Sequence, residues 1–291
     1  MFLSTLRRRN PGFLRAATAL HADGSVPANS YVLDLDAVTA NARVMSQAAA
    51  GLGLTVFAMA KQAGRNPHFC QAVQAGGIEA AVAVDMPCAR AVRSAGLRLG
   101  HLGHLVQVPV HEADEAASMQ PDFWTVFSQD KAAQAAAAAA RAGRVQDLLL
   151  RLHAPGDTFY LGHEGGFAAA DVLAAADDVD SLPGARCAGV TTFPALLFSA
   201  AEGSVEATHN LGTLHAAAGA LRASGRQVQV NAPGTTSSAA FAALAAAGAT
   251  QVEPGHGLTG TTPLHAVTDD LPELPAAGYV TEVSHSYGGR A

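Results

Sequence analysis

The sequence is poor in charge, in cysteine and in long apolar runs. Charged residues make up 14% of the 291 residues and the formal net charge is -6; no basic stripe is present, so we expect no nucleic-acid partner. No apolar run reaches the roughly 20 residues that span a bilayer, so we expect no membrane segment. The first ten residues place their arginines after the apolar residues, which predicts a short amphipathic helix and not a secretory signal.

Cysteine is scarce as well. Cys70, Cys88 and Cys187 are odd in number and widely spaced, a pattern that fits neither a disulfide framework nor a zinc site. We therefore predict reduced thiols, a cytoplasmic location and no metal.

Hydrophobic residues, many of them alanine, make up 49% of the chain. From residue 54 onward a short apolar strand, a loop and an Ala-rich helix repeat. Eight strands are predicted: Leu54–Ala60, Ala80–Val84, Leu99–Val106, Phe123–Phe127, Leu148–His153, Arg186–Thr192, Gln227–Asn231 and Gln251–Glu253. Eight such units in about 200 residues are typical of a TIM (β/α)8 barrel. A doubly wound parallel sheet is the alternative, because periodicity alone does not close a barrel.

Three regions follow from this pattern: an N-terminal helical extension (1–30), a barrel with its preceding strand (31–270), and a linker with the start of a further β domain (271–291). Helices are predicted at 66–75, 131–142, 205–223 and 237–247. The strand Tyr31–Asp36 lies outside the barrel and must pair elsewhere. A last strand is predicted at Tyr279–Ser284.

Lys61 ends the first barrel strand, whose residues 55–60 are all uncharged. A buried ammonium is costly unless it is paired or its pKa falls. A lysine near neutrality reacts with aldehydes such as pyridoxal 5'-phosphate (PLP). The alternative is a lysine whose ammonium reaches into water. Because barrel enzymes carry their active sites at this end of the strands, we predict that Lys61 holds a cofactor.

Two turns after the last barrel strands are candidates for phosphate binding. Gly234, Thr235 and Thr236 follow the seventh strand and precede a helix, and Gly255 and His256 follow the eighth. Small residues at a helix N-terminus bind phosphate through backbone N–H groups, and barrels often bind phosphate between these two strands. An ordinary capped turn after the seventh strand is the alternative.

The chain resembles the alanine racemase-like, PLP-dependent barrel proteins, and within them the YhfX-type amino-acid racemase-like proteins. The resemblance lies in residues 31–41 (YVLDLDAVTAN), 57–67 (FAMAKQAGRNP), 100–109 (GHLGHLVQVP) and 252–265 (VEPGHGLTGTTPLH). It implies a barrel of the alanine racemase N-terminal type with a small β domain made from both chain ends. Only residues 279–291 correspond to that domain, so we expect most of it to be missing, either by truncation or by loss.

The resemblance also implies residue roles. Lys61 is expected to form the Schiff base with PLP. Glu253 stands where alanine racemases have an arginine beneath the pyridine nitrogen, and a carboxylate there is similar to that of related amino-acid decarboxylases; it would keep the nitrogen protonated. His104 resembles a histidine of PLP-homeostasis proteins and is expected near the ring. Thr192 stands where racemases often stack a histidine, so a cofactor contact is expected. Each of these side chains has a purely structural alternative.

The loop 153–167 is rich in glycine and lies on the active face, and such loops often bind substrate. Tyr160 and His163 are its candidate acids or bases. We therefore predict a PLP-dependent enzyme acting at the α-carbon of an amino acid, most simply a racemase working as a homodimer. Two alternatives stay open: a lyase of the D-threonine aldolase or D-serine dehydratase kind, and a PLP-binding carrier without turnover.

Overall fold

The strand that precedes Lys61 closes the sheet on itself. In the computed structural model, which describes residues 2–289, this strand is split at Phe57 into β2 (Thr55–Val56) and β3 (Ala58–Met59). β2 pairs in parallel with β13 (Gln251–Val252), and β3 pairs in parallel with β4 (Ala80–Ala83). The sheet order β2-β13-β12-β9-β7-β6-β5-β4-β3 thus begins and ends on one strand. The predicted eight-stranded barrel is confirmed, and the doubly wound alternative is wrong.

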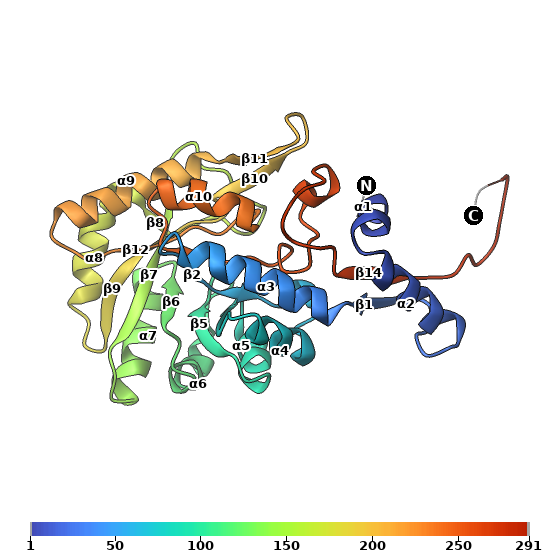
Figure 1. The fold of residues 1–291 in the computed structure, drawn as a ribbon. Coiled ribbons are helices and arrows are strands. Elements are labelled where there is room, and N and C mark those ends of the chain that lie inside the picture. Colours follow the sequence, from blue (N-terminus) through green and yellow to red (C-terminus); the bar gives the residue numbers. More distant parts are fainter. Residues whose placement is uncertain (1, 290–291) are drawn as a thin grey trace.

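The other barrel strands are β5 (Arg98–Leu102), β6 (Phe123–Val126), β7 (Gln146–His153), β9 (Ala185–Thr191) and β12 (Gln229–Asn231), and β8 (Phe167–Ala168) adds a short pairing to β7. Around them lie α4 (Pro67–Ala75), α5 (Met86–Ser94), α6 (Ala113–Ser118), α7 (Gln129–Arg141), α8 (Val172–Asp180), α9 (His209–Ala223) and α10 (Ser238–Ala246) (Figure 1). β13 is followed by a 3-10 turn at Pro263–Ala266, and α3 (Leu35–Ala50), which precedes the barrel, packs between α10 and α4. The ring of helices is thereby completed from the N-terminal side.

Short polar side chains start several of these helices. Asp85 accepts a hydrogen bond from the backbone N–H of Cys88 at 2.7 Å and so caps α5. Asp34 caps α3 in the same way, and Asn66 caps α4, in which Pro67 is the first residue. These caps satisfy N–H groups that lack a partner within the helix.

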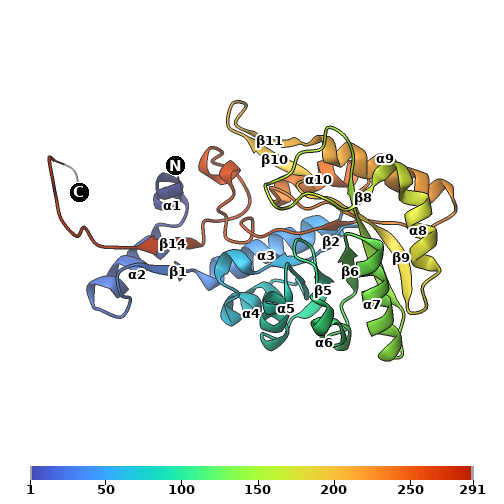
Figure 2. The same cartoon turned by 180° about the vertical axis from the view of Figure 1, so that it is seen from behind.

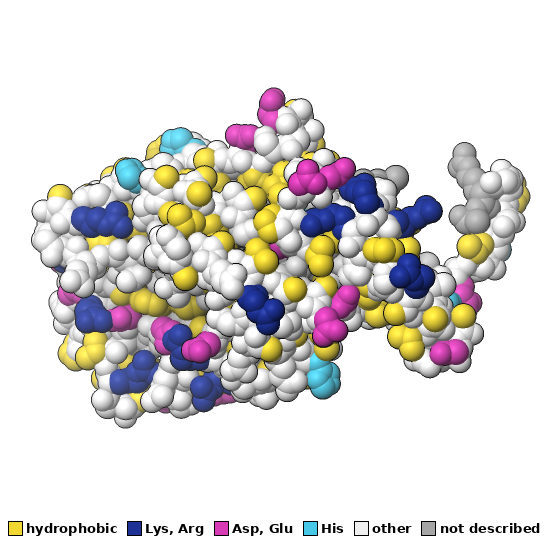
Figure 3. Space-filling view, viewed as in Figure 1, with side chains coloured by type: hydrophobic (Ala, Val, Ile, Leu, Met, Phe, Trp, Pro, Cys, Tyr) yellow, Lys and Arg dark blue, Asp and Glu magenta, His cyan; other side chains and the backbone are white. Residues whose placement is uncertain are grey.

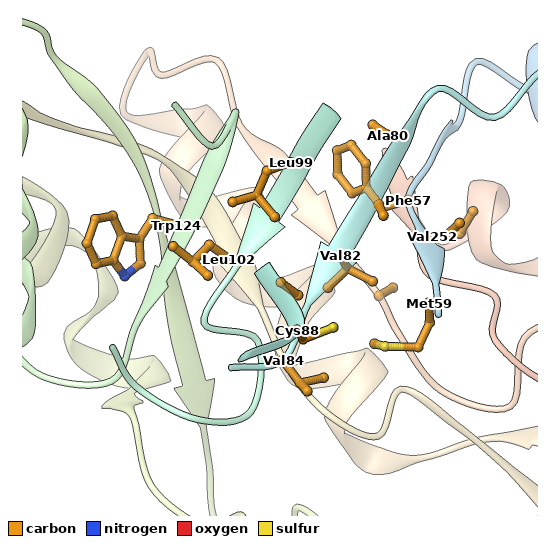
Figure 4. Close-up of a cluster of buried hydrophobic side chains, with 14 of the residues drawn as sticks. Phe57, Met59, Ala80, Val82, Val84, Cys88, Leu99, Leu102, Trp124 and Val252 are labelled. Carbon is orange, nitrogen blue, oxygen red and sulfur yellow. The ribbon is translucent and has the colours of Figure 1, made fainter. Parts of the chain in front are cut away.

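Apolar side chains of neighbouring strands surround Phe57 and Met59 of the first strand (Figure 4). Phe57 is almost completely buried. Its ring fills the space beside Gly100, where an added Cβ would lie 2.3 Å from Phe57 Cδ1. Glycine at this position therefore leaves room for the largest side chain of the closing strand.

A separate small layer lies beside the barrel (Figures 1 and 2). β1 (Ser30–Leu33) pairs antiparallel with β14 (Ala277–Val280), and α1 (Phe2–Arg9) and α2 (Pro11–Ala22) pack against them through Leu6, Phe13 and Ala17. The prediction that the first strand pairs outside the barrel is confirmed. Two helices occur where one was predicted, because Asn10 and Pro11 start a second.

Three element boundaries were wrong. The strand predicted at 99–106 ends at Leu102, because Gly103 has a φ of 76° that leaves the extended region. The helix predicted at 205–223 begins at His209, and the residues before it form a hairpin of β10 (Leu196–Ser199) and β11 (Ser204–Ala207). The last strand is β14, two residues earlier than predicted.

The segment 271–275, expected as a linker, packs against the barrel: Leu271 and Glu273 are buried, and the Leu274 N–H donates to Asn41 Oδ1. On the face shown in Figure 3, acidic and basic side chains are scattered in small groups, several of which contain both signs of charge. Among residues 2–289, no helix has both the length and the apolar character needed to cross a bilayer.

Candidate active site

A cavity of about 270 Å³ opens at the carboxyl ends of the barrel strands. Nine of the residues singled out in the sequence line it: Lys61, His104, Tyr160, Gly234, Thr235, Thr236, Glu253, Gly255 and His256. They come from the ends of four strands and from the loop after a fifth. Thr192 and His163, also expected here, are not among the lining residues.

Lys61 follows β3 and begins a 3-10 turn, Lys61–Ala63. Its side chain is partly buried, and among the described residues its ammonium makes no hydrogen bond or ion pair. Burial lowers the pKa of Lys61, although Cys88 and Glu253 act in the opposite direction. Since the neutral amine is the nucleophile, this environment makes Lys61 more reactive at a given pH than an exposed lysine.

The two turns after β12 and β13 present unused backbone donors. The N–H of Thr235 donates to Leu196 O, and that of Ser238 donates to Glu273 Oε1. Within residues 2–289, the N–H groups of Gly234, Thr236, Ser237, Gly255 and Gly257 donate to no protein group. Buried N–H groups without an acceptor are rare in proteins. Of these five residues, Gly234, Thr236 and Gly255 line the cavity, and neighbouring N–H groups without an acceptor are what an anion such as a phosphate requires.

Glu253 lies on another side of the cavity, completely buried within a polar network. Its Oε1 accepts hydrogen bonds from His101 Nδ1 at 2.5 Å and from Asn231 Nδ2 at 2.9 Å. Burial alone would raise the pKa of Glu253, but the two hydrogen bonds and the nearby imidazoles outweigh it and hold the pKa at about 2. The carboxylate is therefore ionised, and its Oε2 has no hydrogen-bond partner in the described chain.

His104 lies two residues beyond the end of β5, within the segment 99–106 that was predicted as one strand. Its ring packs edge-on against Phe193, with centroids 5.4 Å apart, and its Nδ1 has no hydrogen-bond partner among the described residues. Burial lowers the pKa of His104 to about 3 despite the Glu253 carboxylate, so the ring is neutral.

Donor atoms of His101, His104 and Glu253 lie within 4.8 Å of one another, a spacing that suits a metal. His101 Nδ1 and Glu253 Oε1 already bond each other. A cation bound there would replace a hydrogen bond, and so the cluster serves better as a proton-holding network.

Thr191 and Thr192 at the end of β9 have structural partners. Thr191 Oγ1 donates to Asn231 Oδ1 at 2.7 Å, which orients the amide that bonds Glu253. Thr192 Oγ1 accepts from Asn210 Nδ2 at 3.3 Å and so ties β9 to α9.

Arg65 follows Lys61 by four residues, and its guanidinium is 3.5 Å from the carboxylate of Asp85.

The loop 154–166 is held over the cavity by side chains that the sequence did not reveal. Asn210 accepts from the N–H of Thr158 and donates to its carbonyl, at 2.8 and 2.9 Å. Arg151 is completely buried and donates to the carbonyls of His163 and Phe193. These anchors place Tyr160 against Phe193, with ring centroids 5.5 Å apart.

His163 packs on the outer side of the same aromatic group, 6.0 Å from the Phe193 centroid. Its Nδ1 is buried without a partner among the described residues. Tyr287, near the end of the chain, is 86% exposed and lies away from the lining residues.

Comparisons with known proteins fit this arrangement. The family "Alanine racemase, N-terminal domain" matches residues 33–263, and the chain belongs to this family. It is 40% identical over 290 residues to a protein of Escherichia coli (strain K12) called "Uncharacterized protein YhfX", covering 99% of this chain and 75% of that protein.

Solved structures share the fold. Alanine racemase from Corynebacterium glutamicum is similar with a TM-score of 0.66 and 17% identity over 87% of this chain and 68% of that one. D-threonine aldolase from Filomicrobium marinum has a TM-score of 0.62 and is 18% identical, covering 89% of this chain and 68% of that one. Other neighbours with this barrel are a D-threo-3-hydroxyaspartate dehydratase, a diaminopimelate decarboxylase and a mutant of SrLDC in complex with PLP. By their names these neighbours catalyse several different reactions, and one of them is in complex with PLP.

The residues of this chain fit that cofactor. The cavity combines an unpaired lysine, a cluster of unused N–H groups and an ionised carboxylate with one free oxygen. An aldehyde, a phosphate and a protonated pyridine nitrogen are the groups that these three features bind.

Proposed function

We propose that the protein is a PLP-dependent enzyme that acts at the α-carbon of an amino acid, with Lys61 as the residue that holds the cofactor. The observation that carries this proposal is the placement of Lys61, Glu253 and the free N–H groups around one cavity. When bound, PLP supplies an electron sink for the pair left when a bond to the α-carbon breaks.

The residues have separate duties in this proposal. Lys61 Nζ holds the aldehyde end of the cofactor and afterwards takes and returns a proton on one side of the substrate. Glu253 Oε2 accepts a hydrogen bond from the ring nitrogen and keeps it protonated. The N–H groups of Gly234, Thr236 and Gly255 bind the phosphate, and His104 and His256 border the ring and the phosphate.

Racemisation is the reaction that we propose. It needs acid–base groups on two opposite faces of the substrate. Tyr160 lines the same cavity as Lys61 and is held there by Phe193 and the anchored loop. We assign the second proton transfer to its hydroxyl oxygen. His163 stacks beside Tyr160, with centroids 6.1 Å apart, and supports the ring from the side.

A lyase is the second candidate, supported by the fold shared with D-threonine aldolase and the dehydratase. One experiment separates the two. Purified protein with PLP is incubated with a panel of L- and D-amino acids, and chiral chromatography, ammonia and aldehyde release are measured together. Interconversion of enantiomers without ammonia or aldehyde supports the racemase, and release of either product supports the lyase.

A PLP-binding carrier without turnover is the remaining possibility. It predicts that the bound cofactor's absorbance is unchanged by every amino acid in the same panel. An enzyme predicts a spectral shift with a particular amino acid. We also propose, from the family resemblance and the reduced cysteines, that the protein works in the cytoplasm as a homodimer.

A further inference from the structure

His101 was not among the residues that the sequence singled out, yet both of its ring nitrogens have hydrogen-bond partners. It lies in β5 and is fully buried. Its Nδ1 is 2.5 Å from Glu253 Oε1 and its Nε2 is 2.5 Å from Thr125 Oγ1. The ring is therefore fixed at both nitrogens, by Thr125 of β6 and by Glu253 at the end of β13.

The charge of the Glu253 carboxylate settles which group donates in the hydrogen bond between His101 and Glu253. An ionised carboxylate only accepts, so His101 Nδ1 carries the proton and donates it to Oε1. Asn231 Nδ2 donates to the same oxygen, and Thr191 holds the Asn231 amide in that orientation. Both donors thus bond to Oε1.

Oε2 is left as the free oxygen. It lies 3.5 Å from His104 Nδ1 and has no hydrogen-bond partner among residues 2–289. With both donors on Oε1, the lone pairs of Oε2 keep one orientation toward the cavity.

We propose that His101 is a positioning residue that, together with Thr125, holds Glu253 so that its free oxygen faces the ring nitrogen of the cofactor. This inference rests on the proposed function, because it assigns Glu253 the ring nitrogen as its partner. It adds a residue that acts through Glu253 and does not touch the cofactor.

The test compares two ligands that differ only at the ring nitrogen: PLP and the analogue in which C–H replaces that nitrogen. Their dissociation constants are measured for the wild type, His101→Phe and His101→Asn. Removing an oriented hydrogen bond to a charged group is expected to weaken PLP binding about tenfold in His101→Phe. Binding of the analogue is expected to change by less than about twofold, because it has no nitrogen for Glu253 to bond.

His101→Asn keeps a donor near the position of Nδ1. It is expected to bind PLP nearly as tightly as the wild type does, so that most of the wild-type difference in dissociation constant between PLP and the analogue returns. His111→Gln is the matched control, since His111 is exposed, and it should bind both ligands like the wild type. Equal weakening of both ligands in a folded His101→Phe would overturn the positioning role. If His101→Phe does not fold, Thr125→Val carries the comparison and is expected to show the same selective loss, in smaller degree; equal losses there overturn the role as well.

A second readout needs no cofactor. In protein labelled with ¹⁵N-histidine, the signal of a histidine protonated at Nδ1 and strongly hydrogen-bonded to a buried carboxylate is expected; it should vanish in His101→Phe and shift in Glu253→Gln. A wild type that binds neither PLP nor the analogue would refute the proposed function and this inference with it. A wild type that binds PLP while the variants lose both ligands equally would refute the inference alone.

Discussion

Lys61 and Glu253 follow two strands that are hydrogen-bonded neighbours, and both side chains line one cavity. The link is direct: the N–H of Met59, two residues before Lys61, donates to the carbonyl of Pro254, one residue after Glu253, at 2.9 Å. The strand that closes the barrel therefore also sets the distance between the amine and the carboxylate.

The buried charge of Glu253 makes stability depend on pH. Its pKa of about 2 lies below the ordinary value of 4.5, so its contribution is complete above about pH 5 and is lost as the pH falls toward 2. The difference corresponds to about 3 kcal/mol of unfolding free energy. The free energy of unfolding is measured by urea at pH 5 and at pH 2. We expect it to fall by about 3 kcal/mol more in the wild type than in Glu253→Gln. Parallel losses in the two proteins would contradict the assigned environment.

Tyr160 is expected to be needed for racemisation but not for binding. Removal of one acid–base group typically costs 10²–10⁴-fold in rate, so Tyr160→Phe should reduce the interconversion of enantiomers at least about 100-fold. Exchange of the α-proton of one enantiomer with deuterium should continue, because Lys61 serves that face. Tyr31→Phe, at an exposed position outside the barrel, is the control. Unchanged racemisation by Tyr160→Phe would assign the second proton transfer to another residue.

Asn210 is expected to hold the loop that carries Tyr160. Its side chain makes two hydrogen bonds to the Thr158 backbone, and it is completely buried. Asn210→Ala leaves both backbone groups without these partners, so we expect faster proteolytic cleavage within residues 154–166 and a higher KM for the amino acid. Cleavage at the wild-type rate, seen by mass spectrometry, would show that the loop is held by other contacts.

The packing of Phe57 against Gly100 predicts a size limit in the core. A methyl group at position 100 would overlap the Phe57 ring, and overpacking typically costs about 1–3 kcal/mol. Gly100→Ala should therefore lower the free energy of unfolding by about that amount. Gly212→Ala is the matched control, because an added Cβ there meets no atom within 4 Å. It lies in α9, where alanine is favoured by up to about 1 kcal/mol. Equal effects of the two substitutions would contradict the packing described.

The barrel and the lining of the cavity were accessible from the sequence because they depend on local signals. Alternation of apolar strands and Ala-rich helices predicted the eight strands, and the residues at the strand ends pointed to Lys61, Glu253 and the two turns after β12 and β13. The hairpin before α9 was missed, because Val205 and Ala207 continue the apolar pattern of the helix.

The supporting network was not predicted, because it depends on which residues from distant strands share one layer inside the barrel. His101, Thr125 and Asn231 are buried polar residues within the barrel strands β5, β6 and β12. That signal was present, and buried polar residues at the ends of neighbouring strands would identify such a layer. The hydrogen bond between Thr192 and Asn210 was not predicted for the same reason, because Asn210 lies on a helix whose position in space the sequence does not give.

The most direct test of the account is the attachment of PLP to Lys61. The chain contains only two lysines, and the other, Lys131, donates its ammonium protons to Val108 O and Gln134 Oε1. Protein incubated with PLP is reduced with borohydride at a series of pH values, and the phosphopyridoxyl group is located by peptide mass spectrometry. We predict labelling at Lys61 with a midpoint below pH 10.5, since burial lowers its pKa, and no labelling in Lys61→Ala. Labelling confined to Lys131, or equal labelling of Lys61→Ala and the wild type, would contradict the central claim.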